Sequence, residues 1–133
     1  MELTIIKDIP QMQAMQGHPQ PVPMFLTPKM IPGLDLDIAA VEIASHVGEP
    51  IAAPHVHDAT EIYLAICPNR GDVVFEVICE ENNRFTVDGP AAVVVPAGMT
   101  HQFCPLYVRY APCFFFGVFL RPAHPDAESP AKN

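Results

Sequence analysis

The residues best suited to chemistry lie in one seven-residue segment, His55 to Glu61, which reads HVHDATE. Side chains two residues apart share one face of an extended strand, so His55, His57 and Glu61 are expected to point to the same side. Imidazoles combined with a carboxylate suit iron, manganese, nickel, copper or zinc, whereas calcium prefers oxygen ligands and structural zinc usually has thiolates. His101 could add a third imidazole. The segment therefore predicts a transition-metal site.

The number of ligands indicates what kind of metal site this is. An octahedral ion held by three histidines and one glutamate keeps about two positions for water, O₂ or a chelating substrate. Open positions are typical of a reactive site rather than of a closed structural one. The other histidines, His18, His46 and His124, have no such partners nearby in the sequence, and we interpret them as ordinary core or surface residues.

The composition favours one all-β domain. A chain of 133 residues is long enough for one sizeable core and too short for two. Half of the residues are apolar and sixteen are prolines, which suits short strands joined by turns and predicts little helix.

Charge and cysteine usage narrow the partners and the compartment. Fifteen acidic against seven basic residues give a net charge of −8, which disfavours nucleic acid. The chain has no apolar run of membrane-spanning length and no signal-peptide pattern at Met1, so we expect no membrane partner and a cytoplasmic location. The four cysteines form no C-x-x-C pair and are interpreted as buried thiols rather than disulfides: Cys67, Cys79, Cys104 and Cys113.

The order of apolar runs and turn residues predicts a sandwich or barrel over residues 34–120. We expect strands at residues 34–44, 59–67, 73–79, 84–87, 91–95, 101–105 and 108–120, the last interrupted near Pro112. Residues 1–33 are predicted to be an extended N-terminal arm with at most one or two short strands, and residues 121–133 a solvated tail.

The arm is apolar and irregular, and two roles are open for it. Arms of this kind often pack on a neighbouring subunit, which predicts a homodimer. Alternatively the arm covers its own barrel. The candidate contact residues are Met12, Met15, Val22, Met24, Phe25 and Leu26.

Taken together, these segments resemble the two signature motifs of the cupin superfamily. The first motif runs from Gly48 through His55-x-His57 and Glu61 to Gly71, and the second contains Gly89, Pro96-x-Gly98 and His101. The spacing departs from the usual pattern by one extra residue before His55 and one before Pro96, and by a longer loop after Glu61. Pro105 also stands where the second motif often ends in Asn.

The resemblance implies a double-stranded β-helix, or jelly-roll barrel, with a metal ion in its mouth. It assigns His55, His57, Glu61 and His101 as the ligands of one divalent transition-metal ion. Iron(II) is favoured, with manganese, nickel, zinc and copper as alternatives. The periodicity argument supports the first three ligands independently, whereas His101 depends mainly on the resemblance.

Strand periodicity also predicts the pocket beside the metal. Tyr63 and Cys67 follow Glu61 on the same face, Phe103 follows His101, and Phe114 and Phe116 share a face of the last strand. We predict an apolar cup formed by these side chains, with Met99 as a lid contact. Arg109 is the preferred candidate to bind a substrate carboxylate, ahead of Arg84 and Lys29. The alternative for the rings is ordinary core packing, and for Arg109 a solvated side chain.

The leading functional hypothesis is a non-haem Fe(II) oxygenase or dioxygenase acting on a small, partly apolar organic molecule. The second is a non-redox lyase, isomerase or hydrolase, in which the ion polarises a carbonyl and Glu61 or Tyr63 moves a proton as the base. The third is a binding module that captures a small molecule without turnover. Nucleophilic and phosphate-loop motifs are absent from the sequence.

Overall fold

The computed structural model describes residues 3–8, 24–30 and 33–120, and this part of the chain is almost entirely β-structure. One short 3₁₀ helix, η1 (Ala44–His46), is the helical element of the described residues. The strands are β1 (Met24–Leu26), β2 (Leu36–Glu42), β3 (Thr60–Ala65), β4 (Val73–Cys79), β5 (Asn83–Asp88), β6 (Ala91–Val95), β7 (His101–Val108) and β8 (Phe114–Leu120).

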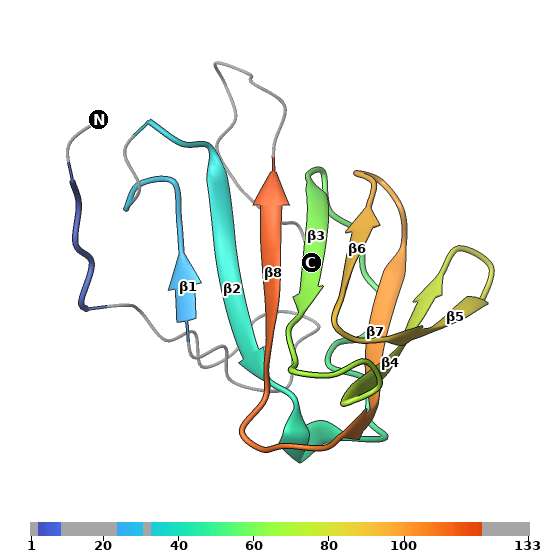
Figure 1. The fold of residues 1–133 in the computed structure, drawn as a ribbon. Coiled ribbons are helices and arrows are strands. Elements are labelled where there is room, and N and C mark those ends of the chain that lie inside the picture. Colours follow the sequence, from blue (N-terminus) through green and yellow to red (C-terminus); the bar gives the residue numbers. More distant parts are fainter. Residues whose placement is uncertain (1–2, 9–23, 31–32, 121–133) are drawn as a thin grey trace.

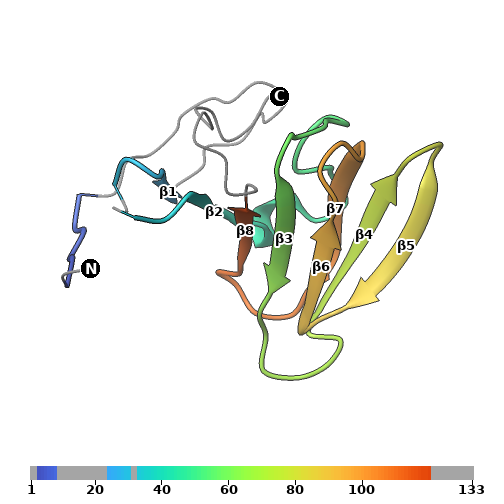
Figure 2. The ribbon, with the colours of Figure 1, turned by 90° about the horizontal axis from the view of Figure 1, so that it is seen from above.

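The strands form two antiparallel sheets (Figure 1). The larger sheet has the order β1-β2-β8-β3-β6, and the smaller has the order β5-β4-β7. Seen from above, β1 and β5 lie at opposite edges of the arrangement (Figure 2). The expected all-β jelly roll is therefore confirmed, and helix is scarce as the proline content predicts.

The core lies between the two sheets and is built from alternating residues of their inner faces. Phe75 of β4 and Phe103 of β7 come from the smaller sheet and are at most 2% exposed. Phe115 of β8 meets them from the larger sheet, with ring centroids 5.2 Å from Phe75 and 5.4 Å from Phe103. Phe115 packs edge-on against both rings, an arrangement that aromatic quadrupoles favour.

Strand β8 is the central strand of the larger sheet and fixes the register around the site. It pairs with β2 on one side and with β3 on the other, so Gly117 lies between Ala39 and Tyr63, and Phe119 between Asp37 and Glu61. Residues 37, 61, 117 and 119 therefore share the inner face of the sheet. Glu61 is brought to the barrel interior by this pairing.

The predicted strand boundaries agree with the structure except at the end of the chain's β-region. The strand predicted at residues 101–105 continues to Val108, so residue 108 ends β7 instead of beginning the last strand. A loop then runs to Phe114. The pairing of β4 with β7 shifts register between Val74, which pairs with Tyr107, and Phe75, which pairs with Pro105; this is the mark of a β-bulge.

The predicted arm is described only in part. Residues 24–26 of the arm form β1, an edge strand paired with residues 38–40 of β2. Met12, Met15, Val22 and the predicted tail lie outside the described residues. The division into arm, barrel and tail and the homodimer stay predictions. No helix in residues 3–8, 24–30 or 33–120 is long and apolar enough to span a lipid bilayer.

Candidate metal centre

The two histidines of the first motif lie in the loop that leads into β3. His55 forms an isolated β-bridge with His101, in which each backbone N–H donates to the other's carbonyl at 3.1 and 2.9 Å. Two residues later, the Gly98 N–H donates to the His57 carbonyl at 2.8 Å. These bonds hold the loop against the segment that precedes β7. Backbone pairing between the motifs, rather than one continuous strand, brings the first two histidines to the third.

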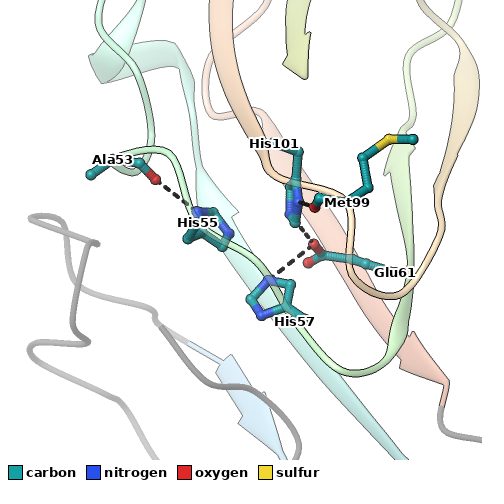
Figure 3. Close-up of polar contacts among 6 residues, drawn as sticks. All are labelled: Ala53, His55, His57, Glu61, Met99 and His101. Carbon is teal, nitrogen blue, oxygen red and sulfur yellow. Dashed lines mark hydrogen bonds and ion pairs between the residues drawn. The ribbon is translucent and has the colours of Figure 1, made fainter. Parts of the chain in front are cut away.

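Four side chains converge in the barrel mouth (Figure 3). Each is at most 8% exposed, and their candidate ligand atoms all lie within 4.8 Å of one another. They are His55, His57, Glu61 and His101. This is the set that the sequence predicts.

Backbone carbonyls orient two of the imidazoles. The Nδ1 atom of His55 lies 2.7 Å from the Ala53 carbonyl, and Nδ1 of His101 lies 2.9 Å from the Met99 carbonyl. Because a carbonyl can only accept, each Nδ1 carries the proton and donates it. The Nε2 lone pair of each ring is then directed toward the cluster. Histidines that bind metals are commonly held by this kind of contact.

Glu61 lies at the centre of the cluster. Its Oε1 atom is 2.9 Å from His101 Nε2 and 3.4 Å from His57 Nε2 (Figure 3). Burial raises the pKa of Glu61, but hydrogen bonds and the charge interactions with His101 and His57 outweigh it and lower the pKa below the usual value. Glu61 Oε1 and the two Nε2 atoms thus meet at one buried point. A buried negative charge needs a positive partner, and a metal cation bound between these atoms would be such a partner.

His57 shows most clearly that a ligand fits the cluster. The ring is 3% exposed, and neither of its nitrogens makes a hydrogen bond with a described residue at good geometry. Leaving buried polar atoms unsatisfied costs about 1–3 kcal/mol. Metal bonds of about 2.0–2.2 Å place two ligand atoms of one ion up to about 4.4 Å apart, so ligand atoms that all lie within 4.8 Å of one another are close enough to approach a single ion. The donor set and its geometry fit a divalent transition-metal ion.

An apolar cavity of about 50 Å³ adjoins the cluster. Three polar side chains, His55, Glu61 and Tyr63, reach its wall, and the remainder is hydrocarbon. The Tyr63 ring lies on Phe103, with centroids 3.6 Å apart. The lining residues are Ala39, Val41, Ile51, Ala52, His55, Glu61, Tyr63, Phe103, Phe115, Gly117 and Phe119.

The structure places some of the predicted pocket residues elsewhere. Tyr63 and Phe103 line the cavity, as predicted. Phe114 and Phe116 do not, because β8 turns Phe115 and Phe119 inward and these two outward. Met99 contributes its backbone carbonyl to His101, and its side chain packs against the core instead of lining the cavity.

Cys67 and Arg109 lie at the opposite end of the barrel from the metal cluster. Cys67 comes six positions after Glu61, and Arg109 eight positions after His101, just past the ends of β3 and β7. At about 3.3 Å per residue, each is roughly 20 Å or more along the chain direction from the cluster. Cys67 lines a second cavity there, together with Phe114 and Phe116. Arg109 is 54% exposed in its side chain and pairs with Asp72 at 3.4 Å.

The other candidates for binding a substrate carboxylate are also away from the cluster. The exposed Arg84 side chain pairs with Glu76 at 2.6 Å, and Lys29 is exposed on the turn after β1. No arginine or lysine of the described residues lines the cavity beside the cluster. The residue preferred for this role, Arg109, lies away from this cavity because it follows the end of β7 and does not belong to the last strand, as the predicted strand 108–120 implied.

Sequence reasoning missed three residues on the inner face of the large sheet. Phe119 packs edge-on against His57, with ring centroids 5.0 Å apart. Asp37 is fully buried on the same face. Gly117 lines the cavity beside the cluster. The alternating run LDLD at residues 34–37 indicates inward leucines and outward aspartates, which is the reverse of what the structure shows, so the sequence holds no signal for Asp37.

Tyr63 is suited to donate a proton rather than to accept one. Burial raises its pKa, and the charge of Glu61 and a hydrogen bond with that carboxylate raise it further, well above the ordinary value for a phenol. The neutral phenol therefore persists at physiological pH. Glu61 and Tyr63 are the two candidate bases, and of these only the Glu61 carboxylate can accept a proton near neutral pH.

Comparison with known proteins gives matches at the level of structure. No family model and no curated protein matches the sequence. A variant of oxalate decarboxylase from Bacillus subtilis superposes with a TM-score of 0.57 at 17% identity, covering 90% of this chain and 29% of that one. A cupin protein from Bacteroides fragilis superposes with a TM-score of 0.53 at 10% identity, covering 96% and 97% of the two chains.

This chain has the cupin fold. The match to the Bacteroides fragilis protein extends over nearly all of both chains, so the whole fold is shared and not merely one sheet. Another oxalate decarboxylase structure from Bacillus subtilis, described for its Mn(II) centres, superposes with a TM-score of 0.56 at 15% identity over 93% of this chain and 30% of that one. This chain thus spans less than a third of the length of the oxalate decarboxylases.

Proposed function

We propose that this cupin is a metal-dependent enzyme acting on a small, partly apolar organic molecule. His55, His57, Glu61 and His101 hold one divalent transition-metal ion. The observation that carries the proposal is the convergence of four buried ligand atoms, three imidazole nitrogens and one carboxylate oxygen, within 4.8 Å of one another. An apolar cavity directly beside this set gives a substrate access to the ion.

The cavity lining suggests the class of substrate. No arginine or lysine of the described residues is present to neutralise an anion there, so a carboxylate or enolate oxygen would bind through the ion itself. The Tyr63 hydroxyl is the remaining donor on the wall. Phe103, Phe115 and Phe119 offer hydrocarbon to the rest of the molecule. A cavity of about 50 Å³ favours a substrate with a short apolar part.

The first candidate reaction is an oxygenation that uses Fe(II) and O₂. A bound iron supplies the site for O₂ chemistry, and the residues of this chain supply its surroundings. The ring of Phe119 against His57 and the apolar cavity wall limit water at the cluster. Glu61 adds one negative charge that partly balances the cation.

The second candidate is a non-redox reaction such as a decarboxylation, elimination or isomerisation, and the protonated Tyr63 favours it. A phenol with a raised pKa beside the carboxylate can donate a proton, or a hydrogen bond, to an oxyanion or carbanion formed in the cavity. The fold shared with the manganese-containing oxalate decarboxylase agrees with such chemistry on this scaffold. Here the ion supplies Lewis acidity alone.

One experiment separates the candidates. The full chain is stripped with a chelator, loaded with Fe(II), Mn(II) or Zn(II), and assayed with small 2-oxo acids, dicarboxylates and diketones in air and under argon. Turnover that needs iron and consumes O₂ identifies the oxygenase. Turnover under argon with manganese or zinc identifies the non-redox enzyme.

The matched control is Arg109→Ala, which removes a charged side chain at the far end of the barrel. It should retain turnover, whereas His57→Ala should lose it. Turnover by the stripped protein, or undiminished turnover by His57→Ala, would contradict the proposal. A ligand that binds the loaded protein and is recovered unchanged from all conditions would indicate a binding module instead.

A further inference from the structure

Gly117 occupies an unusual position for a glycine. It lies in the middle of β8, paired with Ala39 on one side and Tyr63 on the other, and it faces the cavity. Glycine weakens the interior of a strand, because it has no side chain to pack and loses more backbone freedom on folding. In strands it often marks a place where another group must approach the backbone closely. The group that approaches Gly117 is the carboxylate of Glu61.

The space beside Gly117 is occupied by that carboxylate. A methyl group built on Gly117 would lie 3.0 Å from Glu61 Oε2, shorter than the approximately 3.3 Å of close carbon–oxygen contacts. It would also lie 3.7 Å from the Phe119 ring, which is ordinary contact. Glu61 would therefore have to move, because the strand backbone and the packed ring leave the methyl group no other place.

The other carboxylate oxygen of Glu61 is held on the opposite side. Oε1 lies 2.9 Å from His101 Nε2, and the side chain is 2% exposed. The carboxylate is thus confined between the imidazoles and the backbone of β8. Displacing Oε2 from β8 must rotate or shift Oε1 relative to the histidines, because the two oxygens belong to one rigid planar group.

We infer that Gly117 is a positioning residue for the metal centre: its missing side chain lets Glu61 lie against β8 with one oxygen directed at the histidines. The inference rests on the proposed metal-binding function. According to this inference, Gly117 of β8 determines where the carboxylate of Glu61, a residue of β3, lies. The glycine destabilises the interior of β8, but it leaves the space that the Glu61 carboxylate occupies.

Gly117→Ala is expected to change metal affinity and fold stability in different directions. Loss of a neighbouring group that orients a metal ligand typically lowers affinity 10- to 100-fold, and we expect a loss in that range. In the metal-free protein no ion fixes the carboxylate, so Glu61 needs to shift by only a few tenths of an ångström. That variant should unfold at the same temperature as the wild type or a higher one, since alanine suits a strand better than glycine.

The test is an anaerobic titration of the stripped full chain with Co(II), followed by visible absorption and calorimetry, with thermal unfolding of each metal-free variant. Ala39→Val is the matched control, because it adds bulk to the same cavity from the strand opposite Gly117. Only the Gly117 variant should lose Co(II) affinity and show altered ligand-field bands. Equal Co(II) affinity of wild type and Gly117→Ala, or an equal loss in Ala39→Val, would overturn the inference.

A double variant covers the case in which Gly117→Ala does not fold. Replacing Glu61 with alanine removes the group that the new methyl would meet. The variant with both Glu61→Ala and Gly117→Ala should therefore fold and bind Co(II) as weakly as Glu61→Ala alone. If it fails to fold, or binds more weakly than Glu61→Ala, the methyl acts through something other than Glu61. Absence of Co(II) binding by the wild type would instead refute the proposed metal function.

Discussion

The two ends of the barrel treat buried or partly buried carboxylates in opposite ways. At the far end, Glu42 accepts hydrogen bonds from the backbone N–H groups of Ala44 and Cys113 at 2.8 and 2.9 Å, and from the N–H and hydroxyl of Ser45. At the other end, Glu61 lies among imidazoles, with its Oε1 atom 2.9 Å from His101 Nε2 and 3.4 Å from His57 Nε2. The first carboxylate accepts hydrogen bonds from backbone and hydroxyl donors, and the second belongs to the set of side chains proposed to hold a cation.

The pKa values show that both groups are ionised for different reasons. Partial burial raises the pKa of Glu42, but its hydrogen bonds, first that from Cys113, outweigh it and lower the value to about 2. These donors join β2, η1 and the segment before β8, so Glu42 stabilises the fold. The pKa of Glu61 is lowered by the histidines that form the candidate site. We infer that carboxylates with fixed backbone donors serve stability here, and that the carboxylate among imidazoles serves function.

The largest expected effect is a difference in metal affinity between variants at the two ends of the barrel. Glu61→Gln should lower metal affinity by at least about 100-fold, more than the loss typical of residues that merely orient ligands. Glu42→Gln should bind metal as the wild type does. Competition with a chromophoric chelator measures both. A similar loss in both variants would remove the distinction between the ends.

For stability the order should be reversed, so that substitution of Glu42 has a larger effect than substitution of Glu61. Glu42→Ala deletes the acceptor of several donors and should lower the free energy of unfolding by about 2 kcal/mol, because hydrogen bonds to charged groups are worth about 1.5–3 kcal/mol. Glu61→Gln in the metal-free protein should cost less, since it removes a buried charge. Urea unfolding of the stripped proteins gives the comparison. A Glu42→Ala protein as stable as the wild type would show that its hydrogen bonds contribute little.

Acid provides a sharper test of Glu42 alone. Its pKa is lowered from 4.5 to about 2 on folding, so its stabilising contribution is complete above about pH 4.5 and is lost as the pH falls toward 2. The stability advantage of the wild type over Glu42→Gln should therefore shrink across this range. Urea unfolding of the stripped proteins at successive pH values follows it. An advantage that is constant down to pH 2.5 would mean that Glu42 titrates normally in the folded state.

The smallest effect is expected at Arg109. Its ion pair with Asp72 is 3.4 Å long and the guanidinium is largely exposed, so Arg109→Ala should change stability by less than about 1 kcal/mol. It should leave metal affinity and kcat/KM unchanged. Steady-state kinetics, with a substrate identified by the assay proposed under Proposed function, checks the second point. A raised KM would return Arg109 to the substrate site and contradict its placement at the far end.

Much of the metal centre could be predicted from the sequence because its residue types are rare and closely spaced. His55, His57 and Glu61 fall within seven residues, and His101 follows at a distance typical of cupins. The structure brings these four together. The reason given for the histidine pair was incomplete, since the β-bridge between His55 and His101 positions the loop.

The sequence could not predict which side chains of the large sheet point into the barrel, because both faces of this sheet are apolar. Phe114 and Phe116 are as hydrophobic as Phe115, so alternation gives no contrast along β8. The burial of Asp37 could not be predicted for the same reason. Its neighbours Leu36 and Ile38 are apolar, yet they are more exposed than the buried Asp37 between them. The pairing of β8 with β3 decides which residues of β8 point inward, because Glu61 of β3 points inward and lies opposite Phe119.

The central claim is that His55, His57, Glu61 and His101 together hold a single divalent ion. The most direct test counts the ions bound per chain after anaerobic dialysis of the stripped full-length protein against Fe(II) or Mn(II), for the wild type and for His101→Ala. The account predicts one tightly bound ion per wild-type chain and none in the variant. A wild type that retains no ion, or a His101→Ala protein that retains one with equal affinity, would contradict it.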